Sequence, residues 1–145
     1  MKCYIKAKVA HISSVHMAES AGMALAAEIS SLLGISDISF LTDSQLLASF
    51  FNESDFVSPP RWDIKPYTQK FLNATANYNW KVLKVQRDLN VTAHVLANQA
   101  FRSLSTNCNI GNFSCTNVTH VASCPLREAL QFVNWESSLI AAACC

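Results

Sequence analysis

The sequence predicts an α/β fold in a chain of 145 residues, a length typical of one domain. Segments with the alternating or continuous apolar character of strands occur three times. Segments with apolar residues three or four positions apart, which is the helical period, separate them. The resulting order, β-α-β-α-α-β-α over residues 3–104, favours parallel strand pairing through right-handed crossovers. Half of the residues are hydrophobic and 14% are charged, so the chain can bury a sizeable core.

The first part of this order is set by residues 3–51. Residues 3–10 alternate polar and apolar side chains, which predicts a strand with one solvated face. An apolar stripe predicts a helix over residues 17–33, and Gly34 is expected to end it as the C′ residue. The apolar run 38–41 predicts a strand covered on both faces, and residues 44–51 predict a short helix.

The second part continues with helix, strand and helix. Asp63 is expected to cap a helix that carries Pro66 in its first turn, where the missing N–H is tolerated. Residues 80–87 predict a third strand with basic residues at both ends. Asn90 is expected to cap a last helix over residues 91–104.

The chain is expected to divide into an α/β domain over residues 1–104 and a tail over 105–145. The tail is rich in Cys, Asn and Ser and is expected to be irregular, with a short helix near 125–134. No apolar run reaches the roughly 18 to 20 residues that span a bilayer, so we expect no membrane association. Residues 1–8 alternate in polarity, unlike a signal peptide, so we expect an intracellular protein and leave nucleus and cytoplasm open.

Cysteine is frequent, with six residues, and five Asn-x-Ser/Thr sequons also occur. Secretion with disulfides is therefore an alternative to the intracellular interpretation. A second alternative is a small zinc module, because Cys108, Cys115, His120 and Cys124 are zinc-type ligands. The spacing from Cys108 to Cys115 is much wider than usual for such sites, and free intracellular thiols are the competing interpretation.

Several short motifs follow one another in a characteristic order: Ala18-Glu19, Thr42-Asp43-Ser44-Gln45, Trp62, and Arg87-x-x-Asn90-x-x-Ala93-His94-x-Leu96-Ala97. This order resembles the ribonuclease H type 1 family, and most of all its plant branch related to retrotransposon reverse transcriptases. The resemblance covers roughly residues 3–103. It implies a ribonuclease H-like mixed sheet flanked by helices, which presents four carboxylates to two Mg²⁺ ions and to the RNA strand of an RNA–DNA hybrid.

By this resemblance Glu19 and Asp43 are the second and third carboxylate ligands of Mg²⁺, and His94 takes the fourth catalytic position. The resemblance also implies that the chain lacks the first two strands of the family fold and the first carboxylate. We therefore expect residues 3–10 to fill the vacant place beside residues 38–41. Taken singly, Glu19 also suits a solvated helix turn and Asp43 also suits a helix N-cap.

The resemblance implies a domain that contacts RNA–DNA hybrid, with weak or no cleavage because two of the four positions hold no carboxylate. Lys81, Lys84 and Arg87 could form a basic rim for nucleic acid, or a solvated strand edge. The net charge of +1 does not exclude such a local surface. The alternative function is a non-catalytic interaction or remnant domain with no nucleic-acid role.

Overall fold

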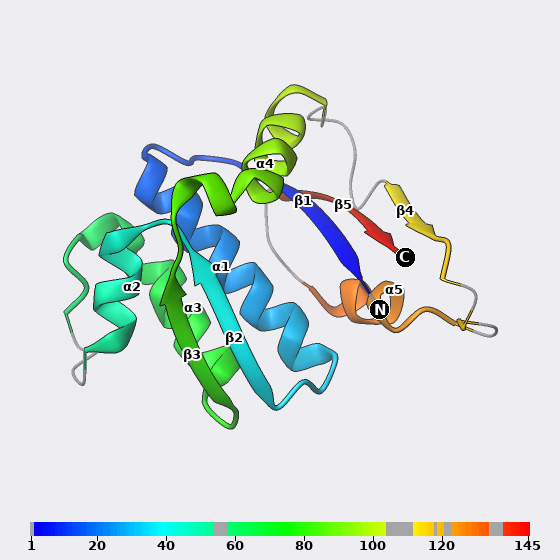
Figure 1. The fold of residues 1–145 in the computed structure, drawn as a ribbon, viewed down its shortest axis with the longest axis horizontal. Helices are drawn as coiled ribbons and strands as arrows, with labels where there is room; N and C mark the ends of the chain where they lie inside the picture. Colours follow the sequence, from blue (N-terminus) through cyan, green and yellow to red (C-terminus); the bar gives the residue numbers. More distant parts are fainter. Residues whose placement is uncertain (1, 54–57, 104–111, 118, 121–122, 134–137) are drawn as a thin grey trace. The chain divides into compact units, whose positions relative to one another are not determined.

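The computed structural model describes residues 2–53, 58–103, 112–117, 119–120, 123–133 and 138–145. They form two compact units, Met1–His11 with Val91–Cys145 and Ile12–Asn90, which we call the first and the second unit (Figure 1). The predicted boundary after residue 104 falls inside the first unit, and the predicted domain division stays a prediction. None of the helices in the described ranges is long and apolar enough to cross a membrane.

The second unit contains the predicted strand and helix order, with ends shifted by a few residues. Its elements are α1 (Val15–Leu32), β2 (Asp37–Thr42), α2 (Gln45–Asn52), α3 (Lys65–Thr75) and β3 (Asn79–Lys84), with 3-10 turns at Trp62–Ile64 and Arg87–Leu89 (Figure 1). The strands β2 and β3 are parallel, as predicted, with Asp37 opposite Asn79 and Thr42 opposite Lys84. The strand predicted over residues 80–87 ends at Lys84.

Local signals fix both ends of α1. At its start the Ser14 hydroxyl accepts a hydrogen bond from the Met17 N–H (3.1 Å), which satisfies one of the free amides of the first turn. At its end Gly34 has φ +68°, as the predicted C′ position requires. The Gly34 N–H donates to the Ser31 carbonyl and the Ile35 N–H to the Ser30 carbonyl, both at 3.0 Å, which is the Schellman arrangement.

Four aromatic rings form the centre of the second unit. Phe71 of α3 is fully buried, and its ring centroid lies 4.9 Å from Phe40 on β2, 4.3 Å from Phe51 on α2 and 5.1 Å from Trp80 on β3. Phe71 therefore contacts both strands and one further helix. Rings at these separations in edge-on or tilted geometry add to the free energy of area burial.

The two faces of the β2–β3 pair differ. Phe40 and Val82 are buried against the aromatic rings and the helices, whereas Leu41 and Leu83 are 60% and 43% exposed. The sequence predicted coverage on both faces of the strand at residues 38–41. Among the described residues, the second face of this pair is open over those two leucines.

Asp63 does not cap α3 as predicted, because Ile64 is the N-cap residue and makes no side-chain cap bond. Instead the buried Asp63 carboxylate accepts hydrogen bonds from Arg61 (3.0 and 3.1 Å) and from the Ser14 hydroxyl (2.9 Å). The Ser14 oxygen thus donates to Asp63 and accepts from the Met17 amide. This chain of bonds ties the start of α1 to the turn before α3.

The first unit combines a three-stranded mixed sheet with two helices. Its elements are β1 (Cys3–Val9), α4 (Val91–Ser103), β4 (Asn112–Cys115), α5 (Pro125–Phe132) and β5 (Ser138–Cys144), and the strand order is β1-β5-β4 (Figure 1). The helix predicted near residues 125–134 is confirmed. The expectation that the rest of the tail is irregular is wrong for β4 and β5.

The predicted pairing of residues 3–10 with residues 38–41 is wrong. β1 pairs antiparallel with β5 along its whole length, from Cys3 opposite Cys144 to Val9 opposite Ser138. Reciprocal hydrogen bonds between Lys2 and Cys145 extend this ladder by one more pair. The physical reason is that the apolar end of the chain forms a strand and satisfies the backbone groups along one edge of β1.

We predict that Phe71→Ala lowers the free energy of unfolding by about 3–5 kcal/mol, because the cavity opens at the contact of both strands with α2 and α3. Urea denaturation followed by tryptophan fluorescence measures the change. Phe132→Ala is the matched control: Phe132 is 70% exposed, so its removal should change the stability by less than about 0.5 kcal/mol. Equal effects of the two substitutions would contradict the central place of Phe71.

We predict that the stability of the fold falls at acidic pH because Asp63 becomes protonated. The Arg61 guanidinium, with help from the Ser14 hydroxyl and against the effect of burial, holds the pKa of Asp63 below its ordinary value of 3.8. A carboxyl with a lowered folded-state pKa stabilises the fold above its unfolded pKa, and this contribution is lost as the pH falls through the folded pKa. Asp63→Asn should therefore reduce the melting temperature at pH 7 and flatten its decrease below pH of about 4.

The matched control for this prediction is Asp88→Asn, because Asp88 is exposed and lies in the turn after β3. Thermal melts of both variants across acidic pH provide the comparison. An Asp63→Asn variant with the same acid dependence as the original chain would refute the assignment. Ser14→Ala should cost about 1 kcal/mol through loss of the helix cap. Where Asp63 is ionised it should cost more, because the hydrogen bond from the Ser14 hydroxyl to that carboxylate is also lost.

Candidate functional site

Glu19 and Asp43 lie toward the same end of the second unit. From Glu19 to the end of α1 the helix rises for 13 residues, or about 20 Å at 1.5 Å per residue. From Asp37 to Asp43 the chain advances six residues, or about 20 Å at 3.3 Å per residue. Residues 33–36 turn the chain back between α1 and β2. Because the two lengths are about equal, Asp43 returns to the level of Glu19 along the helix axis. Figure 1 shows α1 starting at the end where β2 finishes.

The Glu19 carboxylate is half-buried on α1, with 27% of its side chain exposed. Its Oε2 lies 3.8 Å from Nδ1 of His16, one helical turn earlier. That nitrogen is buried and, among the described residues, has no hydrogen-bond partner. His16 was missed in the sequence, although its i, i+3 spacing to Glu19 was a usable signal.

The Asp43 carboxylate is half-buried just beyond the carboxyl end of β2. Its Oδ1 accepts a hydrogen bond from the Asn90 side-chain amide at 2.8 Å. The alternative role of a helix N-cap belongs to Ser44, whose hydroxyl accepts from the Leu47 N–H. Asn90, which the sequence predicted to be a helix cap, thus orients the Asp43 carboxylate.

These two carboxylates do not complete a two-metal site in the described structure. Hard carboxylate oxygens suit Mg²⁺. However, among the described residues no group of three or more Asp, Glu, His or Cys ligand atoms includes Glu19 or Asp43. His94 lies half-buried on α4 and belongs to the first unit, whereas Glu19 and Asp43 belong to the second. The donor set of the second unit therefore does not fit a pair of Mg²⁺ ions.

The three predicted nucleic-acid contacts, Lys81, Lys84 and Arg87, are all exposed. They do not share one face. Along β3 the alternation places Lys81 on the open face with Leu83, and Lys84 on the opposite face with Val82. Arg87 lies in the turn beyond the strand. They therefore lie on both faces of β3 and in the turn beyond it, and they do not form a single flat rim.

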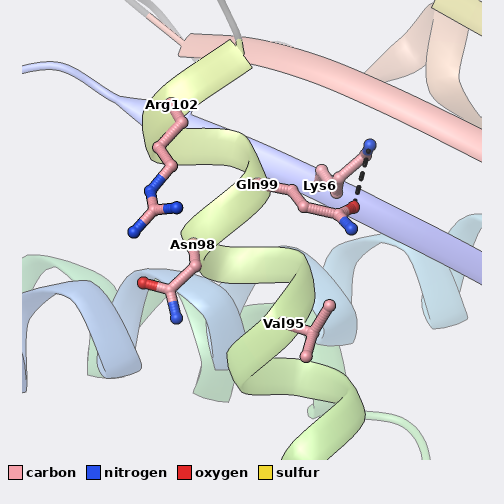
Figure 2. Close-up of a pocket in the computed structure, with 5 residues that line it drawn as sticks. All are labelled: Lys6, Val95, Asn98, Gln99 and Arg102. Carbon is pink, nitrogen blue, oxygen red and sulfur yellow. Dashed lines mark hydrogen bonds between the residues drawn. The ribbon is translucent and has the colours of Figure 1, made fainter.

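The first unit contains a groove that the sequence did not predict. It has a volume of about 500 Å³ and lies where α4 packs on β1. Its lining is Lys6 from β1 and, from α4, Val95, Asn98, Gln99 and Arg102. Figure 2 shows the Gln99 side chain reaching toward Lys6, whose Nζ donates to its Oε1 at 3.3 Å. None of these five described side chains is acidic, so the groove is positively charged.

An aromatic ring adjoins this groove. Phe101, the α4 residue before Arg102, is 76% exposed, and the Lys8 ammonium lies 5.8 Å from the centre of its ring. Lys6 and Lys8 are two residues apart on β1 and share the face toward α4. The signal in the sequence was this i, i+2 pair of lysines together with the helical spacing of residues 95, 98, 99 and 102.

Three of the four zinc-type ligands noted in the sequence also come together in the first unit. These are Cys115, His120 and Cys124, and Cys144 joins them, whereas Cys108 lies outside the described residues. Burial raises the pKa of Cys144 to about 12, and the neighbouring thiols of Cys124 and Cys3 add to this.

The pKa of Cys124, at the start of α5, shifts in the opposite direction to that of Cys144. Burial alone would raise its pKa, but the amides of Arg127 and Leu126 and the Cys115 thiol outweigh that effect and lower the pKa below its ordinary value. Cys124 is the N-cap residue of α5, where the backbone N–H groups of the first turn favour a negative charge. The cluster thus holds one thiol with a lowered pKa beside one with a raised pKa.

Comparison with known proteins gives a likeness in structure alone. No protein-family model matches the sequence, and no curated protein sequence matches it. The fold is similar to that of RNase H1 from the halophilic archaeon Halobacterium salinarum NRC-1, with a TM-score of 0.57 and 18% sequence identity. The match covers 70% of this chain and 97% of that chain. The chain therefore has a mixed α/β, ribonuclease H-like fold.

Proposed function

We propose that this chain is a ribonuclease H-like domain that binds the backbone of nucleic acid, with RNA–DNA hybrid as its preferred ligand, and that cleaves it weakly or not at all. The observation that carries the proposal is a ribonuclease H-like fold with Glu19 and Asp43 toward one end of α1 and β2. No third carboxylate of the described structure joins them.

The proposed lineage is the type 1 family and its plant, retrotransposon-related branch. Its support is the order of the sequence motifs, from Ala18-Glu19 through Thr42-Asp43 to Arg87-x-x-Asn90. Within the second unit these motifs have a physical connection, because Asn90 of the last motif donates to Asp43 of the middle one. The similarity in fold to an archaeal RNase H1 is consistent with this lineage.

Support for nucleic-acid contact comes from the groove of the first unit. Lys6 and Arg102 carry positive charge and Asn98 and Gln99 carry amides, which are the groups that bind phosphate and sugar oxygens. The exposed Phe101 ring beside them can stack on an unpaired base. Contacts of this kind give affinity that depends on salt rather than on base sequence.

Support for weak activity comes from the surroundings of the two carboxylates. Glu19 has His16 3.8 Å away, and Asp43 already accepts a hydrogen bond from Asn90. A pair of magnesium ions needs oxygens that bridge and surround them, and two separate carboxylates supply too few. We therefore propose weak Mg²⁺ binding at Glu19 and Asp43 and assign no catalytic step to His94.

We predict that labelled RNA–DNA hybrid incubated with the purified chain and Mg²⁺ or Mn²⁺ shows cleavage close to background on a denaturing gel. Glu19→Gln and Asp43→Asn should therefore leave the rate unchanged. Glu28→Gln is the matched control, since Glu28 is a half-buried glutamate on the same helix. Robust cleavage that Glu19→Gln abolishes and Glu28→Gln preserves would show that the site is a working nuclease centre.

We also predict measurable binding of hybrid at low salt that weakens steeply as salt is raised. Replacing Lys6 and Arg102 together by Gln should reduce the slope of log K against log salt by about 1 for each lost phosphate contact. The control is Lys65 and Lys70 on α3 replaced together by Gln, which removes the same charge elsewhere. Fluorescence anisotropy measures both.

Two results would refute this part of the proposal. Equal losses in the two double variants would mean that the groove is not the contact surface. Absence of binding by the original chain at low salt would favour the alternative, a non-catalytic interaction or remnant domain. The open face at Leu41 and Leu83 is an observation that favours this second candidate, since exposed apolar side chains on a sheet are suited to contact with another protein.

A further inference from the structure

Three sulfur atoms and one imidazole nitrogen converge in the first unit. The ligand atoms of Cys115, His120, Cys124 and Cys144 all lie within 4.8 Å of one another. His120 Nδ1 is 3.3 Å from the Cys115 sulfur and 3.7 Å from the Cys144 sulfur. We propose that these four side chains bind one zinc ion in a structural Cys₃His site, separate from the carboxylates Glu19 and Asp43.

The sheet brings two of the ligands together. Cys115 ends β4 and Cys144 ends β5, and the parallel register sets these residues opposite each other. Side chains of directly opposed residues in neighbouring strands lie on the same face and close together. A hydrogen bond from the Thr116 N–H to the Cys144 carbonyl, at 2.9 Å, continues the pairing past Cys115.

A turn and a helix start supply the other two ligands. The Asn117 carboxamide oxygen accepts from the Thr119 N–H (2.9 Å) and the Asn117 carbonyl accepts from the His120 N–H (3.2 Å), which directs His120 back toward Cys115. The Asn117 amide also donates to the Cys145 carbonyl, which joins the turn to the end of β5. Cys124 is the N-cap residue of α5.

The distances suit a tetrahedral zinc ion. Bonds of about 2.3 Å to sulfur and about 2.0–2.1 Å to nitrogen place the ligand atoms of a tetrahedron about 3.5–3.8 Å apart. The two separations at His120 Nδ1 are already close to these values. Thiolates and imidazole are softer ligands than carboxylates, and they select zinc over magnesium or calcium. Four protein ligands leave no open position, which is the mark of a structural site.

The proposed site is closed on one side and accessible to the ion on the other. Cys124 and Cys144 are 6% and 1% exposed and form the closed side, whereas Cys115 is exposed and His120 half-buried. Binding of Zn²⁺ to neutral imidazole and three thiols releases three protons and leaves the site with one negative charge. No electron is transferred, and all four protein groups keep their oxidation state.

Metal analysis of the full purified chain, reduced and then incubated with zinc and desalted, is the first test. We expect about one zinc per chain, as a single four-ligand site requires. Competition with a chromophoric chelator then measures affinity. Cys115→Ser removes an exposed ligand without opening the core, and it should weaken zinc binding at least about 10-fold, since even changes outside the ligand set do so.

Cys145→Ser is the matched control, because Cys145 is exposed and lies outside the group of four. It should bind zinc as the original chain does. Circular dichroism verifies that each variant is folded. Cobalt substituted into the original chain should show the visible absorption of a tetrahedral thiolate site and stabilise the chain thermally, a result that needs no variant.

Four outcomes would overturn the proposal, three of them in the metal-binding measurements. These three are absence of bound zinc under reducing conditions, equal affinity of the Cys115→Ser variant and the original chain, and an octahedral cobalt spectrum. The fourth is a disulfide among these cysteines that resists treatment with reductant, detected by intact mass as the loss of two hydrogens. None of these readouts involves nucleic acid, so the zinc site and the proposed function fail or stand independently.

Discussion

The second unit depends on the packing of the Phe71 ring. A two-stranded parallel sheet has too little hydrogen bonding and surface burial to be stable alone. The ring of Phe71 contacts Phe40 on β2 and Trp80 on β3, and Phe51 on α2, so one side chain joins the strands to the helices that cover them. Because this packing requires Phe40 and Trp80 on one face, it also fixes the register of the strands, and the position of Asp43 follows from that register.

The elements of the second unit were predictable because their signals are local. The apolar stripe of α1, Gly34 after it and the apolar run of β2 each act within a few residues, and the structure has all three. The helical position of Glu19 and the strand-end position of Asp43 follow from these lengths alone. Ser14 and Asp63 could not be joined from sequence, since their hydrogen bond spans 49 residues and neither position has a periodic pattern.

The partner of β1 could not be predicted for a similar reason. The apolar end of the chain contains Ala141, Ala142 and Ala143, and alanine favours helix more than strand in isolation. Its strand conformation is imposed by pairing with β1 on one side and β4 on the other. The same pairing brings Cys144 to Cys115, so the spacing of cysteines along the chain, which pointed to Cys108, could not identify the fourth member of the group.

The two candidate metal centres differ in how complete their ligand sets are. Glu19 and Asp43 are hard oxygen donors suited to magnesium, but the described residues add no third such donor. The cysteine cluster offers four softer donors, and every one of its four members comes from a different element or turn. An ion there would fasten β4, α5 and β5, and with β5 it would fasten β1, which carries Lys6 of the groove. If both proposals hold, the zinc ion would hold the binding surface in place, and Lys6 and Arg102 would contact phosphate there.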